Sequence, residues 1–392
     1  MSAPASHEQM VKYLRDTIQI AKRACSLNHH PFGSILVDEN GTVLLQHGNF
    51  GPVNHAESEL ARIAAIFSKI PTTYPVPGEH ITVQDSTIDL DAPLEEGQFI
   101  LKLLSLSVDP YMRGRMRDAS IKSYSPAFPP GKPMTGDTVN VVVKSNNANF
   151  KEGDLVYSKT GCGIFAVRNE PKKTGIPITN YVGVLAMPGM TAYPSLKFGA
   201  PKKGEKLHVS AASGAVGQLV GQIGKTLGLH VFGSAGFDDK VAYLKEIGFD
   251  AAFNYKKVDN LTEKLREVCP NGIDIYFEFV GGQMLEAVIT NCNQFGRIVG
   301  CGMISQYNRE KPEGIHNLMQ VVAKRLRIEG FIVGDSVEMK EPFRKDMTKW
   351  LLEGKIKYRE TVANGIEQTP QALVDVLRGD NFGKQVVKVA DL

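Results

Sequence analysis

A glycine-containing turn near the middle of the chain has the residues and spacing that could hold a phosphate group. The apolar run from Leu207 to Ala212 predicts a strand, and a helical pattern follows from about Gly217. The stretch between them, Ala212-Ser-Gly-Ala-Val-Gly217, has the G-x-G-x-x-G form of a dinucleotide-binding turn, with alanine at the first position. An ordinary tight turn is the alternative, but a position between strand and helix is the context that the motif requires. We therefore predict four cofactor contacts here: Gly214, Ala215, Val216 and Gly217.

Small residues suit this turn for physical reasons. Gly214 lets the backbone approach a pyrophosphate, and Gly217 lets the helix pack close to the strand. The free N–H groups at the helix start then face the phosphate charge. In the predicted helix, four glycines form a stripe beside an apolar one, and because glycine weakens helices we expect close packing to compensate.

The end of the next predicted strand indicates which dinucleotide fits. NAD-specific folds place Asp or Glu there to bind the ribose 2′-hydroxyl. This chain has Gly233-Ser-Ala-Gly236 instead, and Lys240 follows four residues later, where its charge could meet a 2′-phosphate. Asp238 and Asp239 lie nearby, and their negative charges oppose the positive charge of Lys240. The alternative interpretation is that Lys240 is an exposed lysine on a helix. The pattern favours NADPH.

The region around this turn alternates between strand and helix patterns. The predicted strands are Leu207–Ala212, His230–Ser234, Ala251–Tyr255, Ile273–Val280, Arg297–Cys301 and Ile328–Val333. Helical spacing of apolar residues, as in Val241, Leu244 and Ile247, separates them. Such alternation is typical of an α/β fold with a parallel, doubly wound Rossmann sheet.

Other parts of the chain predict further modules. Three prolines and a glycine lie in residues 70–78, which suits a linker. Short strands follow this linker, and they predict a mostly antiparallel, barrel-like domain. The strand-like segment from Gln385 to Val389, near the C-terminus, is assigned to the same domain. The expected division is a short α/β module at 1–69, a linker at 70–78, a small domain at 79–178 and 349–392, and a dinucleotide-binding domain at 179–348.

The first module contains half of a zinc-site motif. A helix is predicted at residues 10–27, a hairpin from Ser34–Val37 and Thr42–Leu45, and a second helix from about Ala56 to Ser68. His55-Ala-Glu57 at the start of the second helix is similar to a zinc deaminase motif, in which the histidine binds zinc and the glutamate moves protons.

Residues 8–69 thus resemble the N-terminal half of the cytidine and guanine deaminase-like family. The later P-C-x-x-C motif that completes this family's zinc site is missing, because residues 58–161 contain no cysteine. One local ligand does not make a catalytic zinc site. We therefore expect a remnant or accessory module rather than an active deaminase.

Composition excludes several classes of function. The 392 residues suffice for two or three domains, and a formal net charge of +3 gives no reason to expect nucleic acid or a membrane surface as a partner. The sequence contains no apolar run long enough to span a bilayer and no secretory signal in its first residues. Its five cysteines show no C-x-x-C pairing, which favours reduced thiols in a cytoplasmic protein.

Residues 79–392 resemble the zinc-independent medium-chain dehydrogenase/reductases, in particular the group of prostaglandin reductases, leukotriene B4 dehydrogenases and plant alkenal double-bond reductases. The matching stretches are Ser107–Arg113, Met187–Tyr193, Ser210–Gly217, Gly248–Lys256, Cys301–Asn308, Glu329–Val333 and Asn381–Lys384. The resemblance implies a Rossmann domain with a GroES-like small domain, often as a homodimer. It further implies that NADPH reduces the carbon–carbon double bond of a small-molecule enone.

The resemblance also assigns roles to residues. It implies that Tyr255 contacts the cofactor phosphate and that Asn381 is a C-terminal cofactor ligand. The further cofactor-binding residues that it implies are Cys301 and Gly302 near the nicotinamide, and Phe331. The chain departs from the family at Tyr276-Phe-Glu-Phe-Val-Gly-Gly282, where Phe279 replaces an asparagine that contacts the cofactor. Because phenylalanine cannot make an amide's hydrogen bonds, cofactor affinity or nicotinamide orientation could differ.

The expected chemistry needs a hydrogen-bond donor. Zinc alcohol dehydrogenases use Cys and His ligands, but the small domain has only Cys162 and His80, so we predict no metal site. Reduction of an enone produces an enolate, which hydrogen-bond donors can stabilise. Tyr307, by resemblance, is the first candidate catalytic donor, and Tyr111 after the Asp109-Pro110 turn is the second.

Two alternatives remain open at this point. Each tyrosine could serve packing alone. The whole chain could also be a non-catalytic NADPH-binding protein of the quinone reductase type. A bifunctional deaminase–reductase is disfavoured by the missing cysteines.

Overall fold

The computed structural model describes residues 33–37, 43–48, 62–86, 90, 92–159, 163–166 and 175–392. The chain forms two compact units. One contains Met1–Ala64, Gln84–Lys102 and Val142–Gly153, and the other contains Ala65–Val83, Leu103–Val141 and Asp154–Leu392. Among the described residues, no helix is both long and apolar enough to cross a membrane.

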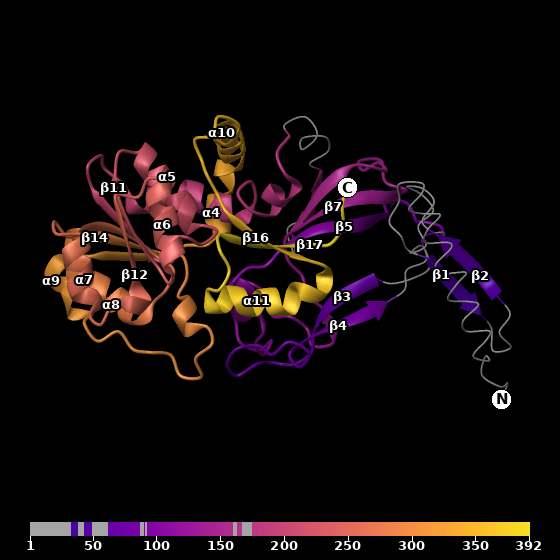
Figure 1. The fold of residues 1–392 in the computed structure, drawn as a ribbon, viewed down its shortest axis with the longest axis horizontal. Coiled ribbons are helices and arrows are strands. Elements are labelled where there is room, and N and C mark those ends of the chain that lie inside the picture. Colours follow the sequence, from indigo (N-terminus) through magenta and orange to yellow (C-terminus); the bar gives the residue numbers. More distant parts are fainter. Residues whose placement is uncertain are drawn as a thin grey trace. The chain divides into compact units, whose positions relative to one another are not determined.

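A six-stranded parallel sheet lies within the second unit (Figure 1). Its order is β12-β11-β10-β13-β14-β15, and every neighbouring pair is parallel. The strands are β10 (Lys206–Val209), β11 (His230–Ala235), β12 (Ala251–Asn254), β13 (Ile273–Glu278), β14 (Cys292–Gly300) and β15 (Arg327–Gly330). The order reverses between β10 and β13, where ligands bind in open α/β sheets. The predicted doubly wound α/β fold is confirmed.

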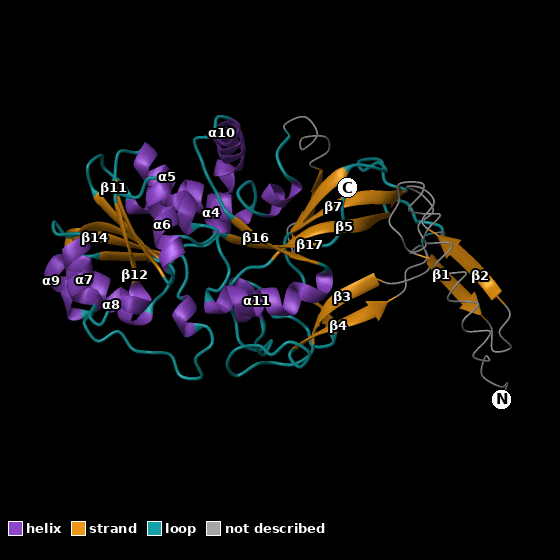
Figure 2. Cartoon of the chain, in the orientation of Figure 1, coloured by secondary structure: helices purple, strands orange, loops and turns teal. Residues whose placement is uncertain are grey.

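Helices cover both faces of this sheet (Figure 2). On one face, α5 (Gly217–Thr226) and α6 (Asp238–Glu246) belong to one hydrophobic core, together with α4 (Met187–Ser195) and α10 (Lys340–Leu352). On the other face lie α7 (Leu261–Val268), α8 (Gly282–Asn291) and α9 (Met319–Lys324). Phe277 packs into the first core and its neighbour Tyr276 into the second, as strand alternation requires.

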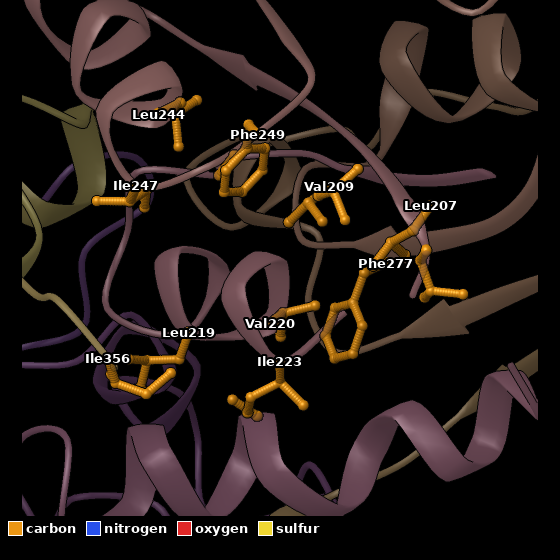
Figure 3. Packing of buried hydrophobic residues seen from close by; sticks show 14 of the residues in the cluster. Leu207, Val209, Leu219, Val220, Ile223, Leu244, Ile247, Phe249, Phe277 and Ile356 are labelled. Atoms are coloured by element: carbon orange, nitrogen blue, oxygen red, sulfur yellow. The ribbon is translucent and has the colours of Figure 1, made fainter. Parts of the chain in front are cut away.

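Close packing compensates for the glycines of α5. Leu219, Val220 and Ile223 of α5 pack in one core with Leu207 and Phe249, among the residues drawn in Figure 3. A Cβ atom added at Gly221 would lie 2.0 Å from the Phe249 ring, and one at Gly224 would lie 2.8 Å from Leu207 Cδ2. Side chains at these positions would push α5 off the sheet, so the glycine stripe sets the distance between helix and sheet.

A second six-stranded sheet has the order β16-β17-β5-β7-β8-β9. Its strands are β5 (Phe99–Ser107), β7 (Thr138–Ser145), β8 (Leu155–Lys159), β9 (Gly163–Ala166), β16 (Glu360–Asn364) and β17 (Lys384–Lys388). The pairs β17–β5, β7–β8 and β8–β9 are antiparallel and β16–β17 is parallel. The predicted return of the C-terminal strand to the small domain's sheet is confirmed by the pairing of Val386 with Ser107.

Shorter elements complete the fold. Strands β4 (Ile81–Ser86), β3 (Arg62–Phe67) and β6 (Lys132–Pro133) form a sheet, and β1 (Gly33–Val37) and β2 (Val43–Gly48) form an antiparallel hairpin. The other helices of the described residues are α2 (Tyr111–Arg115), α11 (Thr369–Arg378) and the 3₁₀ turns η1 (Ile178–Val182), η2 (Leu196–Gly199), η3 (Tyr255–Lys257), η4 (Ile304–Gln306), η5 (Val333–Met339) and η6 (Ile366–Gln368). The hairpin predicted at residues 34–45 is confirmed.

The helix predicted from Ala56 to Ser68 is wrong over its second half. Strand β3 occupies residues 62–67 instead, and Ile66 pairs with Pro133 of β6. Phe67 is completely buried, and its ring centroid lies 6.0 Å from that of Phe128. Pairing and burial of this apolar segment decide its conformation against the helical pattern. The helix predicted at residues 10–27, and His55 and Glu57, lie outside the described residues.

The proline-rich segment 70–78 connects two strands of one sheet. It joins β3 to β4, and Ser68 N–H donates to His80 O at 2.8 Å where the two strands approach. The sequence predicts an interdomain linker here because prolines stop helices, but they also suit a rigid connection between strands. The domain ranges proposed from the sequence remain a prediction.

His208 is a buried titratable group in the centre of β10. Its ring lies 6.2 Å from that of Phe253 and 5.5 Å from that of Tyr276, and neither ring nitrogen has a hydrogen-bond partner among the described residues. Burial lowers the pKa of His208 from 6.5 to about 3. Below about pH 6.5 the unfolded chain binds a proton at this site that the folded chain excludes. Stability is therefore lost as pH falls from 6.5 toward 3.

We expect His208→Phe to remove this pH dependence. The slope is about 1.4 kcal/mol per pH unit. The variant should therefore gain about 2 kcal/mol of unfolding free energy relative to the parent at pH 5 compared with pH 8. Urea denaturation at both pH values measures the difference, with exposed His230→Gln on neighbouring β11 as the control. A stability change in His208→Phe that is equal at both pH values would contradict the assignment.

Candidate functional site

The predicted dinucleotide turn lies at the switch point of the parallel sheet. Strand β10 ends at Val209, three residues earlier than predicted, because Ala211 has a left-handed φ of 43° that breaks the extended chain. A Cβ added at Gly217 would lie 2.7 Å from Ala211 O and 2.8 Å from Ala212 Cα. Only glycine permits this approach of α5 to the turn that follows β10.

Helix α5 begins with N–H groups that are free to bind an anion. Gln218 N–H donates to Gly214 O at 3.2 Å, and Gly214 N–H donates to Ala211 O at 2.9 Å. In the described part of the chain, no hydrogen bond is found for the N–H groups of Ala215, Val216 and Gly217. Free donors at the positive end of a helix fit a pyrophosphate, so this observation supports dinucleotide binding.

Basic groups and a tyrosine hydroxyl lie close to the glycine that follows β11. A Cβ added at Gly236 would lie 3.2 Å from the Tyr255 hydroxyl and 3.1 Å from Lys256 Cε. The ammonium groups of Lys240 and Lys256 lie 5.0 and 4.3 Å from the centroid of the Phe237 ring. Tyr255, Lys240 and Lys256 thus gather at the strand end where a 2′-phosphate would lie. Sequence reasoning missed Lys256, although it directly follows Tyr255.

The acidic residues near Lys240 are engaged elsewhere. Asp238 forms an ion pair with Lys257 at 2.5 Å and accepts a hydrogen bond from Asn254, and these contacts lower its pKa. Asp239 accepts a bond from the Lys240 backbone N–H at 2.8 Å. These carboxylates therefore reduce the positive charge available for a phosphate at Lys240 and Lys256 less than the sequence alone suggests.

Lys240 also ties the C-terminal segment to this site. Its ammonium donates to Gly379 O and Asn381 O, both at 2.6 Å. Burial of the side chain lowers the pKa of Lys240. Residues Gly214 and Gly383 form a β-bridge, and Asn381 Nδ2 donates to Gly383 O at 2.9 Å. The structure thus brings Lys240, Asn381 and the dinucleotide turn together.

The loop after β14 folds back onto the end of β13. The N–H groups of Cys301 and Gly302 donate to Glu278 O at 3.0 and 3.2 Å, and Ile304 N–H donates to Phe279 O at 2.8 Å. Phe279 lies half-buried with its ring centroid 5.1 Å from that of Phe277. The Phe279 ring therefore lies at the end of β13, where the resemblance predicts an asparagine.

Glu278 is a completely buried carboxylate that sequence reasoning missed. Its Oε1 accepts hydrogen bonds from Val280 N–H at 2.5 Å, Gly281 N–H at 2.9 Å and the Tyr276 hydroxyl at 2.9 Å. Burial raises the pKa of Glu278, while these donors oppose the shift. Ser210 Oγ accepts from Phe279 N–H at 3.0 Å and so joins the dinucleotide turn to the same network. A charged residue inside an aromatic strand pattern is the signal that could have revealed it.

Tyr307 has a hydroxyl group prepared to donate. The hydroxyl oxygen accepts a hydrogen bond from Met303 N–H at 3.1 Å, so its own hydrogen remains free for another acceptor. Burial raises the pKa of Tyr307 to about 12, which keeps the group protonated at neutral pH. A Cβ at Gly302 would lie 2.8 Å from this hydroxyl, so the glycine keeps room for it.

Tyr111 is the first residue of α2 and packs against the same hydrophobic cluster as Tyr307. Burial, followed by the negative charges of Asp109 and Asp137, raises the pKa of Tyr111. Asp109 is itself buried and forms an ion pair with Lys384 at 3.3 Å, which fixes the end of β5 against β17. Sequence reasoning missed this pair, although both residues lie in the quoted family stretches.

Phe331 is placed in the core instead of at an open site. It is 9% exposed, and its ring is stacked on Phe198 with centroids 5.2 Å apart. Its side chain therefore packs against the sheet, and only its backbone is left to contact a cofactor.

Among the described residues, no group of three or more His, Cys, Asp or Glu side chains is arranged to hold a metal ion.

Comparisons with known proteins cover most of this chain. The family described as "Zinc-binding dehydrogenase" matches residues 215–353, and "N-terminal domain of oxidoreductase" matches residues 66–176. The chain is 45% identical over 341 residues to the 2-alkenal reductase (NADP(+)-dependent) of Nicotiana tabacum, covering 85% of this chain and 98% of that protein. It is 41% identical over 320 residues to the (+)-pulegone reductase of Mentha piperita, covering 79% of this chain and 93% of that protein.

A solved structure shows the same architecture. The crystal structure of CurA from Vibrio vulnificus in complex with NADPH is similar with a TM-score of 0.77 and 39% sequence identity. The match covers 84% of this chain and 100% of that chain.

We expect Lys240→Ala to weaken binding of NADPH far more than binding of NADH, because only NADPH has a 2′-phosphate. A charge-assisted hydrogen bond of this kind accounts for about ten- to a hundred-fold in affinity. Quenching of protein fluorescence by each dinucleotide measures both dissociation constants. Lys245→Ala, an exposed lysine on the same helix, is the matched control. Equal losses for the two dinucleotides would show that Lys240 serves only to anchor residues 379 and 381.

Proposed function

Because the chain belongs to the medium-chain dehydrogenase/reductase family, in its group of NADP-dependent alkenal and enone reductases, we propose that it reduces α,β-unsaturated ketones and aldehydes. The bond reduced is the carbon–carbon double bond next to the carbonyl group, with NADPH as cofactor. The observation that carries this proposal is the Tyr307 hydroxyl, which lies on the loop after β14 and accepts a hydrogen bond from Met303 N–H, so that its own hydrogen is free.

The residues present fit NADPH. The free N–H groups of residues 215–217 would hold the pyrophosphate, and Lys240 and Tyr255 would hold the 2′-phosphate. Asn381 and the backbone of Cys301 and Gly302 would contact the rest of the cofactor. When bound, NADPH supplies the hydride that is added to the β-carbon of the substrate.

The protein's part in the chemistry is to stabilise negative charge on the substrate. Addition at the β-carbon produces an enolate, whose charge is concentrated on the former carbonyl oxygen. We propose that the Tyr307 hydroxyl donates a hydrogen bond to this oxygen. Tyr111, on helix α2, is the second candidate donor. A buried, preorganised donor is effective because it needs no reorganisation as the charge develops. The enolate is then protonated at its α-carbon.

We propose that this reaction uses no zinc. The enolate needs hydrogen-bond donors, which the two tyrosines supply, and the sequence of the small domain offers one cysteine and one histidine. Activity should accordingly survive treatment with a chelator.

The enzyme assay follows NADPH consumption with a panel of enones, with saturated ketones as controls. We expect turnover of enones alone, and Tyr307→Phe should lower kcat by about ten- to a thousand-fold. KM and NADPH affinity should change little, because the hydroxyl acts in the transition state. Tyr193→Phe, which removes a hydroxyl bound to Asp346 at 2.5 Å, is the matched control. Parent-level turnover by Tyr307→Phe would transfer the role to Tyr111.

We also propose that the chain forms a homodimer through the edge of its parallel sheet. Strand β15 lies at this edge, with Ile328 43% exposed. Around it, Met319 and Val322 are 77% and 73% exposed, and Phe295 is 61% exposed. An exposed apolar patch beside an open strand edge suits a second copy of the chain.

Light scattering after size-exclusion chromatography tests the dimer. The parent should have about twice the chain mass of 42.9 kDa. Met319→Lys should lower the measured mass toward that of a single chain. Leu352→Lys, which changes an exposed leucine on α10, should leave the measured mass unchanged. A parent that elutes as a monomer at micromolar concentration would refute the dimer.

Two further expectations remain proposals. The three cysteines described, Cys269, Cys292 and Cys301, form no disulfide, which supports a reducing compartment such as the cytoplasm. For the region around His55 and Glu57 we propose an accessory remnant without deaminase activity. Support comes from the missing P-C-x-x-C motif and from the family matches, which begin at residue 66.

A further inference from the structure

Arg113 joins three segments that are far apart in the sequence. Its Nε donates to Asn308 Oδ1 at 2.9 Å and to Thr73 O at 3.2 Å. Its Nη2 donates to Thr73 O at 2.9 Å and to Pro71 O at 3.1 Å. One guanidinium group therefore connects α2, the β3–β4 connection and the loop after β14.

The setting of this guanidinium is unusual for an arginine. Arg113 is 8% exposed, and every acceptor just named is a neutral oxygen atom. Among the ion pairs of the described residues, none includes Arg113. Burying a cation without a carboxylate partner is unfavourable, so stability alone gives little reason for it. The planar, multiply bonded guanidinium instead fixes the geometry of what it joins.

The side-chain amide of Asn308 also has a fixed orientation. It is 7% exposed, and its Nδ2 has no hydrogen-bond partner among the described residues. Because a guanidinium can only donate, the Asn308 amide must present its oxygen to Arg113, and its NH₂ group is left unpaired. The contact with Arg113 therefore leaves a buried amide donor without a partner among the described residues.

Both ends of this link are next to a candidate catalytic tyrosine. Asn308 directly follows Tyr307, and Arg113 is two residues after Tyr111 on the single turn of α2. The two tyrosines pack against one hydrophobic cluster. The link thus fixes the loop of Tyr307 relative to the helix of Tyr111.

We infer that the Arg113–Asn308 hydrogen bond is a positioning element of the active site. It holds the loop of residues 303–308 so that the Tyr307 hydroxyl meets the substrate's carbonyl oxygen. Arg113 and Asn308 are positioning residues and do not touch the substrate. The inference depends on the proposed function, because the position matters for the enone's oxygen.

The test compares two substitutions at one position. Asn308→Ala removes the acceptor, and we expect kcat to fall about ten- to a hundred-fold, the range for a misplacement near 1 Å. Affinity for NADPH should remain unchanged. Asn308→Asp keeps an oxygen for Arg113, removes the unpaired NH₂ group and adds opposite charge, so kcat should stay within about two-fold of the parent. Arg297→Met, a half-buried guanidinium paired with Glu205 in the parallel sheet, is the control for lost stability.

A double-mutant cycle separates positioning from a general structural role. If Asn308 acts through the Tyr307 hydroxyl, Asn308→Ala should have little further effect on kcat in a Tyr307→Phe background. A loss of equal size in both backgrounds would overturn the inference. So would parent-level kcat in Asn308→Ala.

Hydrogen exchange gives a readout that does not require turnover. Backbone amides of residues 303–308 should exchange at least about ten-fold faster in Asn308→Ala than in the parent, and at the parent rate in Asn308→Asp. If the parent itself reduces no enone, the proposed function fails, and exchange alone then decides whether the link holds the loop. Unchanged exchange in Asn308→Ala would refute the link.

Discussion

The buried carboxylate of Glu278 is the interaction on which the candidate site most depends. One oxygen of this side chain accepts hydrogen bonds from the N–H groups of Val280 and Gly281 and from the Tyr276 hydroxyl. The main-chain oxygen of the same residue accepts the N–H groups of Cys301 and Gly302. The turn into α8 and the loop that carries Tyr307 are therefore both held at one residue. Through Ser210 the same network reaches the start of the dinucleotide turn, so a shift at Glu278 would move both the loop of Tyr307 and this turn.

Two kinds of contact hold the site around this point. Glycines set the position of α5 and of the turn before it, because Gly217 lies close to the Ala211 and Ala212 backbone and Gly221 lies close to Phe249. Charged hydrogen bonds to main-chain oxygens hold the outer segments, as Lys240 does for residues 379 and 381 and Arg113 does for residues 71 and 73. Because these cations bind carbonyl groups, they fix the path of the chain instead of simply balancing charge.

The sequence predicts those features that depend on local patterns. The six parallel strands, the glycine turn and the C-terminal strand follow from apolar periodicity and glycine spacing, and the structure confirms them. The helix predicted at residues 56–68 is wrong over residues 62–67, because an apolar segment can be helix or strand and pairing with β6 decides it. Glu278, Arg113 and Asn308 could not be found in the same way. The sequence marks Glu278 only by its charge within an aromatic strand pattern. The partners of Arg113 and Asn308 are distant in sequence or lie on the main chain, which no residue pattern records.

The most direct measurement follows the fate of deuterium in the product. The enzyme is incubated with an enone and NADPH that is deuterated at the transferring position of the nicotinamide, and the product is examined by NMR. We predict a saturated ketone with deuterium at the β-carbon and a solvent-derived hydrogen at the α-carbon. An unsaturated alcohol with deuterium on the former carbonyl carbon would contradict it, because the Tyr307 hydroxyl would then not be serving an enolate.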